Sequence, residues 1–189
     1  VSRICMGCMG FGDPTNGMHS WTLDYQHSLE IIKRGLELGI NFFDTAEMYS
    51  VPGRKETYGS TEKIIGTWFK KSGKREEIVL ASKIAGPNPN FGYMRENLDF
   101  SPASIKLALD QSLQRLQTDY IDVYQLHWPE RKTNYFGQRG FKVQEDGWED
   151  NIHNVLETLD GFVKEGKINH IGLSNENPWG IMRFLEESK

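Results

Sequence analysis

The stretch Val79-Leu80-Ala81-Ser82-Lys83 reads VLASK, a short apolar run whose last residue is charged. Four further runs of this kind occur along the chain, each bounded by turn residues. The runs are mostly apolar instead of alternating between apolar and polar residues, which is typical of strands buried on both faces. We therefore predict five strands: Arg3–Met9, Ile40–Asp44, Ile78–Lys83, Tyr120–His127 and Ile168–Ser174.

Helical periodicity fills the segments between these runs, because apolar residues recur there every three or four positions. Thr22 is placed to cap the first helix, whereas Ser101-Pro102 and Asn177-Pro178 combine a capping side chain with proline at the first helical position. The predicted helix stops are glycines: Gly39, Gly73 and Gly166. A strand followed by a helix, five times over, predicts an α/β fold with parallel strands and right-handed connections.

Two segments interrupt the alternation of strands and helices, Gly86–Phe100 and Pro129–Trp148. Both are rich in glycine, proline, asparagine and charge, and both follow the carboxyl end of a predicted strand. Ligands bind at that edge in parallel α/β folds, so we interpret the segments as binding loops and not as surface decoration. No linker divides the chain, so residues 1–189 are predicted to form a single domain.

Composition and net charge disfavour several kinds of partner and location for this protein. The 26 acidic residues outnumber the 22 basic ones, and the net charge of -4 argues against nucleic acid as a main partner. No apolar run approaches the ~18 residues that a membrane span needs, so we expect no membrane partner. Two cysteines cannot form a disulfide framework, which favours a cytoplasmic protein.

Polar side chains end four of the predicted strands. Asp44, Lys83 and His127 each end an apolar run, and Ser174-Asn175 follows the fifth strand. Successive positions are 39, 44 and 47 residues apart, which corresponds to one strand–helix unit per step. If the strands are parallel neighbours, these side chains converge at one edge of the sheet and perturb one another's proton affinities.

Tyr49 lies five residues after Asp44, so a short loop can return its phenol to the same edge. A phenol with an ordinary pKa near ~10 is a weak acid at neutral pH. We expect the Lys83 ammonium to lower the pKa of Tyr49, and Asp44 to hold that ammonium in place. Such a cluster could protonate a developing alkoxide. Taken singly, the residues also have structural explanations, as a turn cap, a solvated lysine or a core histidine.

These motifs resemble the aldo-keto reductases, NADPH-dependent enzymes with a (β/α)8 TIM-barrel fold. The resemblance extends over essentially the whole chain and is carried by Asp44–Tyr49, Ala81–Lys83, Leu126–Pro129 and Gly172–Asn175. Within the family, the runs at 46–52 and 116–120 are similar to the Tas-type bacterial branch. The glycine-rich stretch at 4–12 is similar to the family's first barrel strand.

The resemblance implies a catalytic tetrad of Asp44, Tyr49, Lys83 and His127. Tyr49 would protonate the carbonyl oxygen of an aldehyde or ketone as hydride arrives from NADPH. Lys83 and Asp44 would tune this tyrosine, and His127 would orient the carbonyl group. Asp44 would also lie near the nicotinamide ribose.

Further binding roles follow from the same resemblance. Ser174 and Asn175 would hold the nicotinamide carboxamide. Trp128, with Tyr135 or Phe136, would form apolar walls of the substrate pocket. The cofactor would therefore be NADPH and the partner a small-molecule carbonyl compound.

The family pattern contains eight β/α units, and this sequence predicts five. A complete barrel takes ~250 residues, so we expect the chain to be the N-terminal portion of a longer enzyme. The missing units would carry the aromatic residue that stacks on nicotinamide and the basic residues for the adenosine phosphates. Two alternatives are a half that pairs with a second chain or with itself, and a degenerate relative that folds differently.

Three other interpretations of the motifs are disfavoured by the sequence. Cys5 and Cys8 have C-x-x-C spacing, but positions three apart on a strand face opposite sides, which disfavours a metal or dithiol site. The glycines at 7–12 lack the G-x-G-x-x-G spacing of a dinucleotide-binding fold. Asp44, Glu47 and His127 could ligate a divalent metal, but Lys83 between them would repel it, so we expect no metal.

Two alternatives concern charge and function. One cluster of basic residues could attract an anionic substrate, although a solvated loop face is the simpler interpretation: Arg131, Lys132, Arg139 and Lys142. The rival function is a non-catalytic binding or regulatory protein that retains part of the barrel. The four tetrad residues by themselves do not distinguish a non-catalytic protein of this kind from an enzyme.

Overall fold

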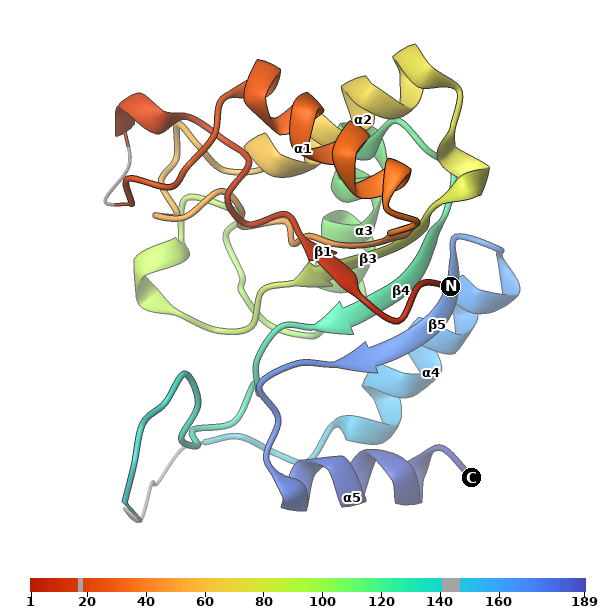
Figure 1. Ribbon diagram of the computed structural model, residues 1–189. Coiled ribbons are helices and arrows are strands. Elements are labelled where there is room, and N and C mark those ends of the chain that lie inside the picture. The colour runs from red at the N-terminus through yellow and green to blue at the C-terminus, as the bar shows by residue number, and fades with distance from the viewer. Residues whose placement is uncertain (17–18, 141–146) are drawn as a thin grey trace.

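The computed structural model describes residues 1–16, 19–140 and 147–189 and shows a parallel sheet along which helices are arranged (Figure 1). In this part of the chain the sheet order follows the sequence order, and each strand is parallel to the next. The five predicted strands are confirmed, with shorter bounds for most: β1 (Cys5–Gly7), β2 (Phe42–Asp44), β3 (Val79–Ile84), β4 (Ile121–Leu126) and β5 (Ile168–Leu173).

A helix follows each strand, so the predicted alternation is confirmed. The α-helices are α1 (Tyr25–Glu37), α2 (Ser60–Ser72), α3 (Pro102–Leu116), α4 (Ile152–Lys164) and α5 (Pro178–Glu187). Each helix contacts the next along the chain, as expected where right-handed connections place every helix on the same face of the sheet. The loops that follow the strands gather at one end of the sheet (Figure 1).

The helix caps agree with the sequence at two of three positions. The side chains of Ser101 and Asn177 accept hydrogen bonds from backbone N–H groups in the first turns of α3 and α5. The prediction for Thr22 is wrong, because Asp24 caps α1 by accepting from the His27 N–H at 2.9 Å. The carboxylate of Asp24 directly precedes the helix, whereas Thr22 is buried two residues earlier.

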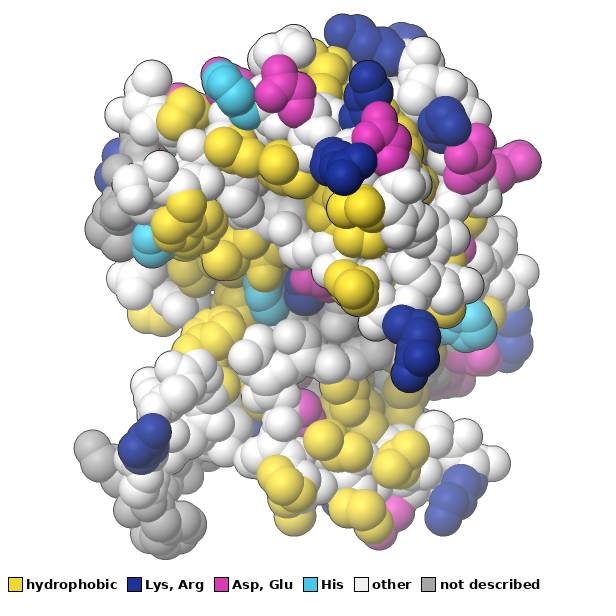
Figure 2. All heavy atoms as spheres, viewed as in Figure 1, with side chains coloured by type: hydrophobic (Ala, Val, Ile, Leu, Met, Phe, Trp, Pro, Cys, Tyr) yellow, Lys and Arg dark blue, Asp and Glu magenta, His cyan; other side chains and the backbone are white. Residues whose placement is uncertain are grey.

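The prediction that the strands are buried on both faces is confirmed for β3 and is wrong for the two edge strands, β1 and β5. Cys5 and Gly7 of β1 are exposed, and so are Asn169 and His170 of β5. Among the described residues these two strands pair on one side only, so they are the edge strands of the sheet. Apolar side chains also gather over α5 at the lower edge of Figure 2, and the exposed ones are Trp179, Ile181, Met182 and Leu185.

Two apolar clusters lie at different levels of the fold. The main core packs between the sheet and the helices and includes Phe43, Leu80 and Tyr124. The second, here called the loop cluster, lies at the carboxyl ends of the strands and consists of Ala46, Met48, Ala85, Met94 and Trp128. The loops therefore have a packed base of their own. Among the described residues, no helix combines the length and apolarity that a bilayer span requires.

Close packing of α2 against α3 depends on Gly66. A Cβ atom at this position would collide with the backbone of Arg115 and Leu116 at the end of α3. We expect Gly66→Ala to lower the free energy of unfolding by roughly 1–3 kcal/mol, as overpacking does. Gly161 of α4 is the matched control, because nothing lies within 4 Å of an added Cβ there. Gly161→Ala should raise that free energy by about 0.5–1 kcal/mol through helix propensity.

Urea titration followed by circular dichroism measures both variants. Equal effects of the two substitutions would show that backbone crowding at Gly66 does not limit the packing of these helices.

Candidate active site

Parallel strand ends bring the predicted charged residues together. Asp44 ends β2, and Lys83 lies near the end of the neighbouring strand β3. The Lys83 Nζ donates to Asp44 Oδ2 at 2.7 Å and to the Thr45 carbonyl oxygen at 2.8 Å. The lysine side chain is 6% exposed and that of Asp44 is 31% exposed. The ammonium is therefore fixed by two acceptors, whereas part of the carboxylate faces solvent.

Gln125 also belongs to this cluster, and the sequence analysis missed it. Its Nε2 donates to Asp44 Oδ1 at 3.1 Å. Gln125 pairs with Lys83 in the sheet and lies two residues before His127. Since side chains two apart on a strand point to the same face, this alternation was the signal that could have identified it.

The phenol of Tyr49 reaches the same edge, as the sequence predicts. Its hydroxyl lies 3.4 Å from His127 Nε2, and the two rings meet edge to face with centroids 5.6 Å apart. The Lys83 Nζ lies 5.0 Å from the centroid of the Tyr49 ring. The structure thus brings Asp44, Tyr49, Lys83 and His127 into one cluster.

The expected pKa of Tyr49 is wrong in direction. Burial, and then the negative charge of Asp44 and the thiol of Cys8, raise the pKa of Tyr49 to about 12. The Lys83 ammonium does not reverse this, because the Asp44 carboxylate at 2.7 Å offsets its charge. The phenol is therefore protonated throughout the neutral range.

The imidazole of His127 is neutral in this environment. Burial and the nearby Lys83 ammonium lower the pKa of His127 to about 3. Within the described residues, its Nδ1 is buried with no hydrogen-bond partner. The ring can therefore exchange hydrogen bonds at Nε2, on the side of Tyr49, without carrying charge.

Ser174 and Asn175 lie directly beyond β5, beside His127. The Asn175 Nδ2 donates to the His127 carbonyl oxygen at 2.8 Å and contacts Ser174 Oγ at 3.0 Å. Asn175 is exposed and adopts a positive φ of 54°, a conformation that asparagine tolerates better than most residues. Both side chains are thus close to the tetrad on the loop side.

Trp128 is 1% exposed, and its Nε1 donates to the Pro87 carbonyl oxygen at 3.2 Å. The indole ring packs beside His127, with centroids 4.9 Å apart, and stacks on Tyr135. Phe136 is the exposed aromatic residue here, and its ring centroid lies 6.3 Å from that of His127. An aromatic wall therefore flanks the imidazole. Residues 141–146 of the predicted loop lie outside the described residues.

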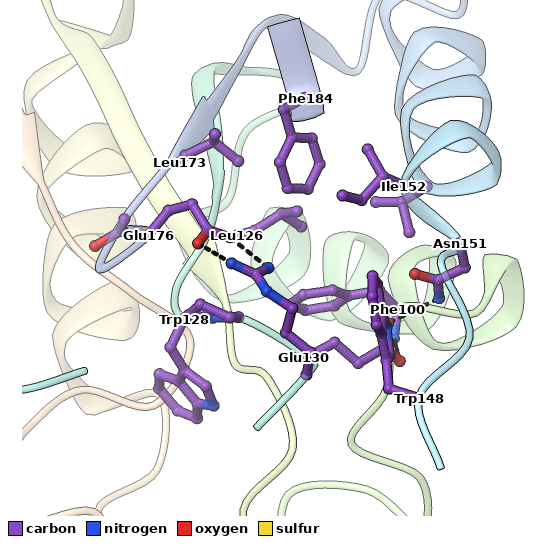
Figure 3. Close-up of a pocket in the computed structure, with 14 residues that line it drawn as sticks. Phe100, Leu126, Trp128, Glu130, Trp148, Asn151, Ile152, Leu173, Glu176 and Phe184 are labelled. Atoms are coloured by element: carbon purple, nitrogen blue, oxygen red, sulfur yellow. Dashed lines mark hydrogen bonds and ion pairs between the residues drawn. The ribbon is translucent and has the colours of Figure 1, made fainter. Parts of the chain in front are cut away.

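A small pocket lies between α4, α5 and the loop after β4 (Figure 3). Leu126, Leu173, Ile152 and Phe184 line it, whereas the tetrad does not. Leu126 and Leu173 neighbour each other in the sheet, on the face that the helices cover. The pocket therefore belongs to the outer layer of the fold.

An ion pair lines this pocket, where Arg131 donates to both carboxylate oxygens of Glu176 at 2.5 and 3.0 Å. The two side chains are 10% and 5% exposed. Arg131 is thus engaged inside the protein, which corrects its inclusion in a solvated basic cluster. Lys142 of that cluster lies outside the described residues.

The metal and cysteine alternatives gain no support from the geometry. Among the described residues, no three His, Cys, Asp or Glu side chains are arranged to hold a metal ion. Glu47 is fully buried against Arg95, away from Asp44 and His127. Cys5 is exposed, Cys8 is buried, and both are free.

Comparisons with known proteins agree with this architecture. The model of the "Aldo/keto reductase family" matches residues 3–189. "Protein tas" of Escherichia coli K12 is 40% identical over 187 residues, which is 98% of this chain and 51% of the relative. An oxidoreductase of Bacillus subtilis, YrpG, is 36% identical over 100% of this chain and 50% of its own length. The chain thus spans about half the length of these curated relatives.

Solved structures lead to the same family. Aldo-keto reductase AKR11C1 of Bacillus halodurans, in its holo form, superposes with a TM-score of 0.70 and is 32% identical over 99% of this chain and 50% of its own. An aldo/keto reductase of Klebsiella pneumoniae in complex with NADP and acetate gives a TM-score of 0.62 at 28% identity, over 94% of this chain and 47% of its own. From the family match over nearly all residues, this chain belongs to the aldo/keto reductase family, with the Tas protein among its relatives.

Proposed function

We propose that this chain carries the acid–base part of the active site of an NADPH-dependent enzyme that reduces aldehyde or ketone carbonyls to alcohols. The observation that carries the proposal is the cluster in which Lys83 binds Asp44 at 2.7 Å while Tyr49 lies between Lys83 and His127. A proton donor, a cation and a neutral imidazole around one space are the groups that a developing alkoxide requires.

Tyr49 is assigned as the general acid. With a pKa of about 12 the phenol holds its proton at neutral pH, so it can donate that proton to the carbonyl oxygen. The phenolate left behind lies beside the Lys83 ammonium, 5.0 Å from the ring centroid. The neutral His127 can donate a hydrogen bond from Nε2 to the same oxygen. At 3.4 Å the Tyr49–His127 contact is long, so both groups can turn toward a bound carbonyl.

The residues at the strand ends fit the nicotinamide end of NADPH. The Ser174 hydroxyl and the exposed Asn175 amide offer a donor and an acceptor to a carboxamide, directly beside His127. Asp44 is partly exposed and can accept a bond from a ribose hydroxyl. When bound, NADPH would supply the hydride. The NADP complex of the Klebsiella relative supports this choice of cofactor.

The carbonyl substrate would lie against the aromatic wall of the loop after β4. Phe136 offers an exposed ring near His127, and Tyr135 and Trp128 pack behind it. An apolar substituent on the carbonyl carbon would bury its surface there. Trp128 then shapes the pocket from a buried position.

Replacing Tyr49 by Phe tests the acid. The variant removes only the hydroxyl, so turnover of a simple aromatic aldehyde should fall at least about 100-fold, within the usual range for general acid catalysis. NADPH binding, measured by quenching of its fluorescence, should remain. Tyr58→Phe is the matched control, because this phenol bonds to Gln111 and Arg115 outside the cluster. Turnover retained in Tyr49→Phe would remove the acid assignment, and absence of NADPH binding by the unmodified chain would favour a non-catalytic protein.

Replacing Asp44 by Asn tests the electrostatics through pH. Asp44 raises the pKa of Tyr49 and offsets the charge of Lys83, so its neutralisation should lower that pKa. The protonated phenol is lost as pH rises through its pKa, so the alkaline fall in kcat/KM should begin at lower pH in the variant than in the unmodified chain. Asp122→Asn is the control, since Asp122 pairs with Arg75 away from the cluster. An alkaline limb that stays in place or moves upward would contradict the assignment.

A further inference from the structure

The loop that carries Tyr49 also carries a buried carboxylate that the chemistry above does not use. Glu47 lies two residues before Tyr49, and its side chain is 0% exposed. Its backbone N–H donates to the Lys83 carbonyl oxygen at 3.1 Å. Its Oε1 accepts from the Ala85 N–H at 2.6 Å. Glu47 thus binds the backbone on both sides of Ile84, the residue that follows Lys83.

Arg95, from the loop between β3 and α3, completes this arrangement. Its guanidinium donates from one nitrogen to both oxygens of Glu47 at 2.8 Å, and from the other nitrogen to the Ala85 carbonyl oxygen at 3.0 Å. The Arg95 side chain is 3% exposed. One ion pair therefore ties together the Tyr49 loop, the end of β3 and the loop after β3.

Apolar packing surrounds the pair on the side of the active site. Ala85 belongs to the loop cluster, which Ala46 and Met48 of the Tyr49 loop join. The partly buried Tyr49 packs against this cluster. Because the ion pair is shielded from water, either charge alone would be costly, so the two groups hold a single geometry.

We propose that Glu47 and Arg95 are positioning residues that set the distance between the Tyr49 phenol and the Lys83 ammonium. Their effect on catalysis rests on the proposed function. Their effect on the position of the Tyr49 phenol is independent of that function. They act through the backbone on either side of Ile84, the residue after Lys83, and through the loop that carries Tyr49.

The chain contains a matched control for this pair. Glu62 of α2 is also 0% exposed and binds Arg115 at 2.7 Å and the Ser82 hydroxyl at 2.6 Å. Ser82 is the neighbour of Lys83 in sequence, but its side chain points to the helices. Glu62→Gln therefore removes an equally buried charge next to β3. The Glu62 carboxylate binds Arg115 of α3 and Ser82 of β3, and it reaches the loop of Tyr49 only through the bond from Arg115 to the Tyr58 hydroxyl.

The experiment compares Glu47→Gln, Arg95→Lys and Glu62→Gln in the full chain, with kcat expressed per folded molecule. In Glu47→Gln we expect kcat for an aromatic aldehyde to fall about 10- to 100-fold, as displacements of about 1 Å do. KM for NADPH should change less than about threefold, because Ser174 and Asn175 are not bound to the pair. Arg95→Lys keeps a cation, so its kcat should lie between those of Glu47→Gln and Glu62→Gln. This variant also provides the measurement if Glu47→Gln fails to fold. Glu62→Gln should leave kcat unchanged.

A second measurement does not depend on turnover. In fluorotyrosine-labelled protein, the 19F resonance of Tyr49, assigned by its loss in Tyr49→Phe, should shift in Glu47→Gln and not in Glu62→Gln. An unchanged resonance, or equal kcat losses in both glutamine variants, would overturn the positioning role. If the unmodified chain shows no turnover, the proposed function fails, and the resonance comparison still decides the role of Glu47.

Discussion

The contact on which the site depends is the ion pair between Lys83 and Asp44. It joins the ends of two neighbouring strands, and its ammonium is held by a carboxylate and by the Thr45 carbonyl oxygen. Removing Asp44 would leave the buried Lys83 ammonium without a counter-charge, which is more costly than losing the pair as a whole. The same pairing explains why the lysine does not acidify Tyr49, since its charge is already offset. The contact therefore fixes the strand ends, whereas the raised pKa of Tyr49 follows first from burial of its ring and then from Asp44.

Most of the fold was predictable because its signals are local. Apolar runs of five to eight residues, glycine stops and the Ser101 and Asn177 caps each depend on residues near one another in the sequence. The exposure of β1 and β5 was not predictable from apolar content, since burial depends on which strand lies beside each edge. The cap of α1 was misplaced because the helix begins at Tyr25, so that Asp24, and not Thr22, directly precedes its first turn.

The site was predictable to the extent that parallel strands align their ends. Spacing and strand direction were sufficient to place Asp44, Lys83 and His127 together, whereas the pKa of Tyr49 depends on how deeply the ring is buried. Ala85 and Arg95, which bind the Glu47 side chain, lie 38 and 48 residues after it in the sequence, and no local pattern links them to it. Contacts of this kind can be recognised only in the folded structure, where the loops lie side by side.

Separation of the loop cluster from the main core has a consequence for heat stability. Tyr49 and His127 lie on loops whose packing is confined to a small set of side chains, whereas the helices and sheet are held by the larger core. Small packed units open at lower free energy than the body of a domain. On heating, we therefore expect the loops around Tyr49 and His127 to open before the helical dichroism is lost.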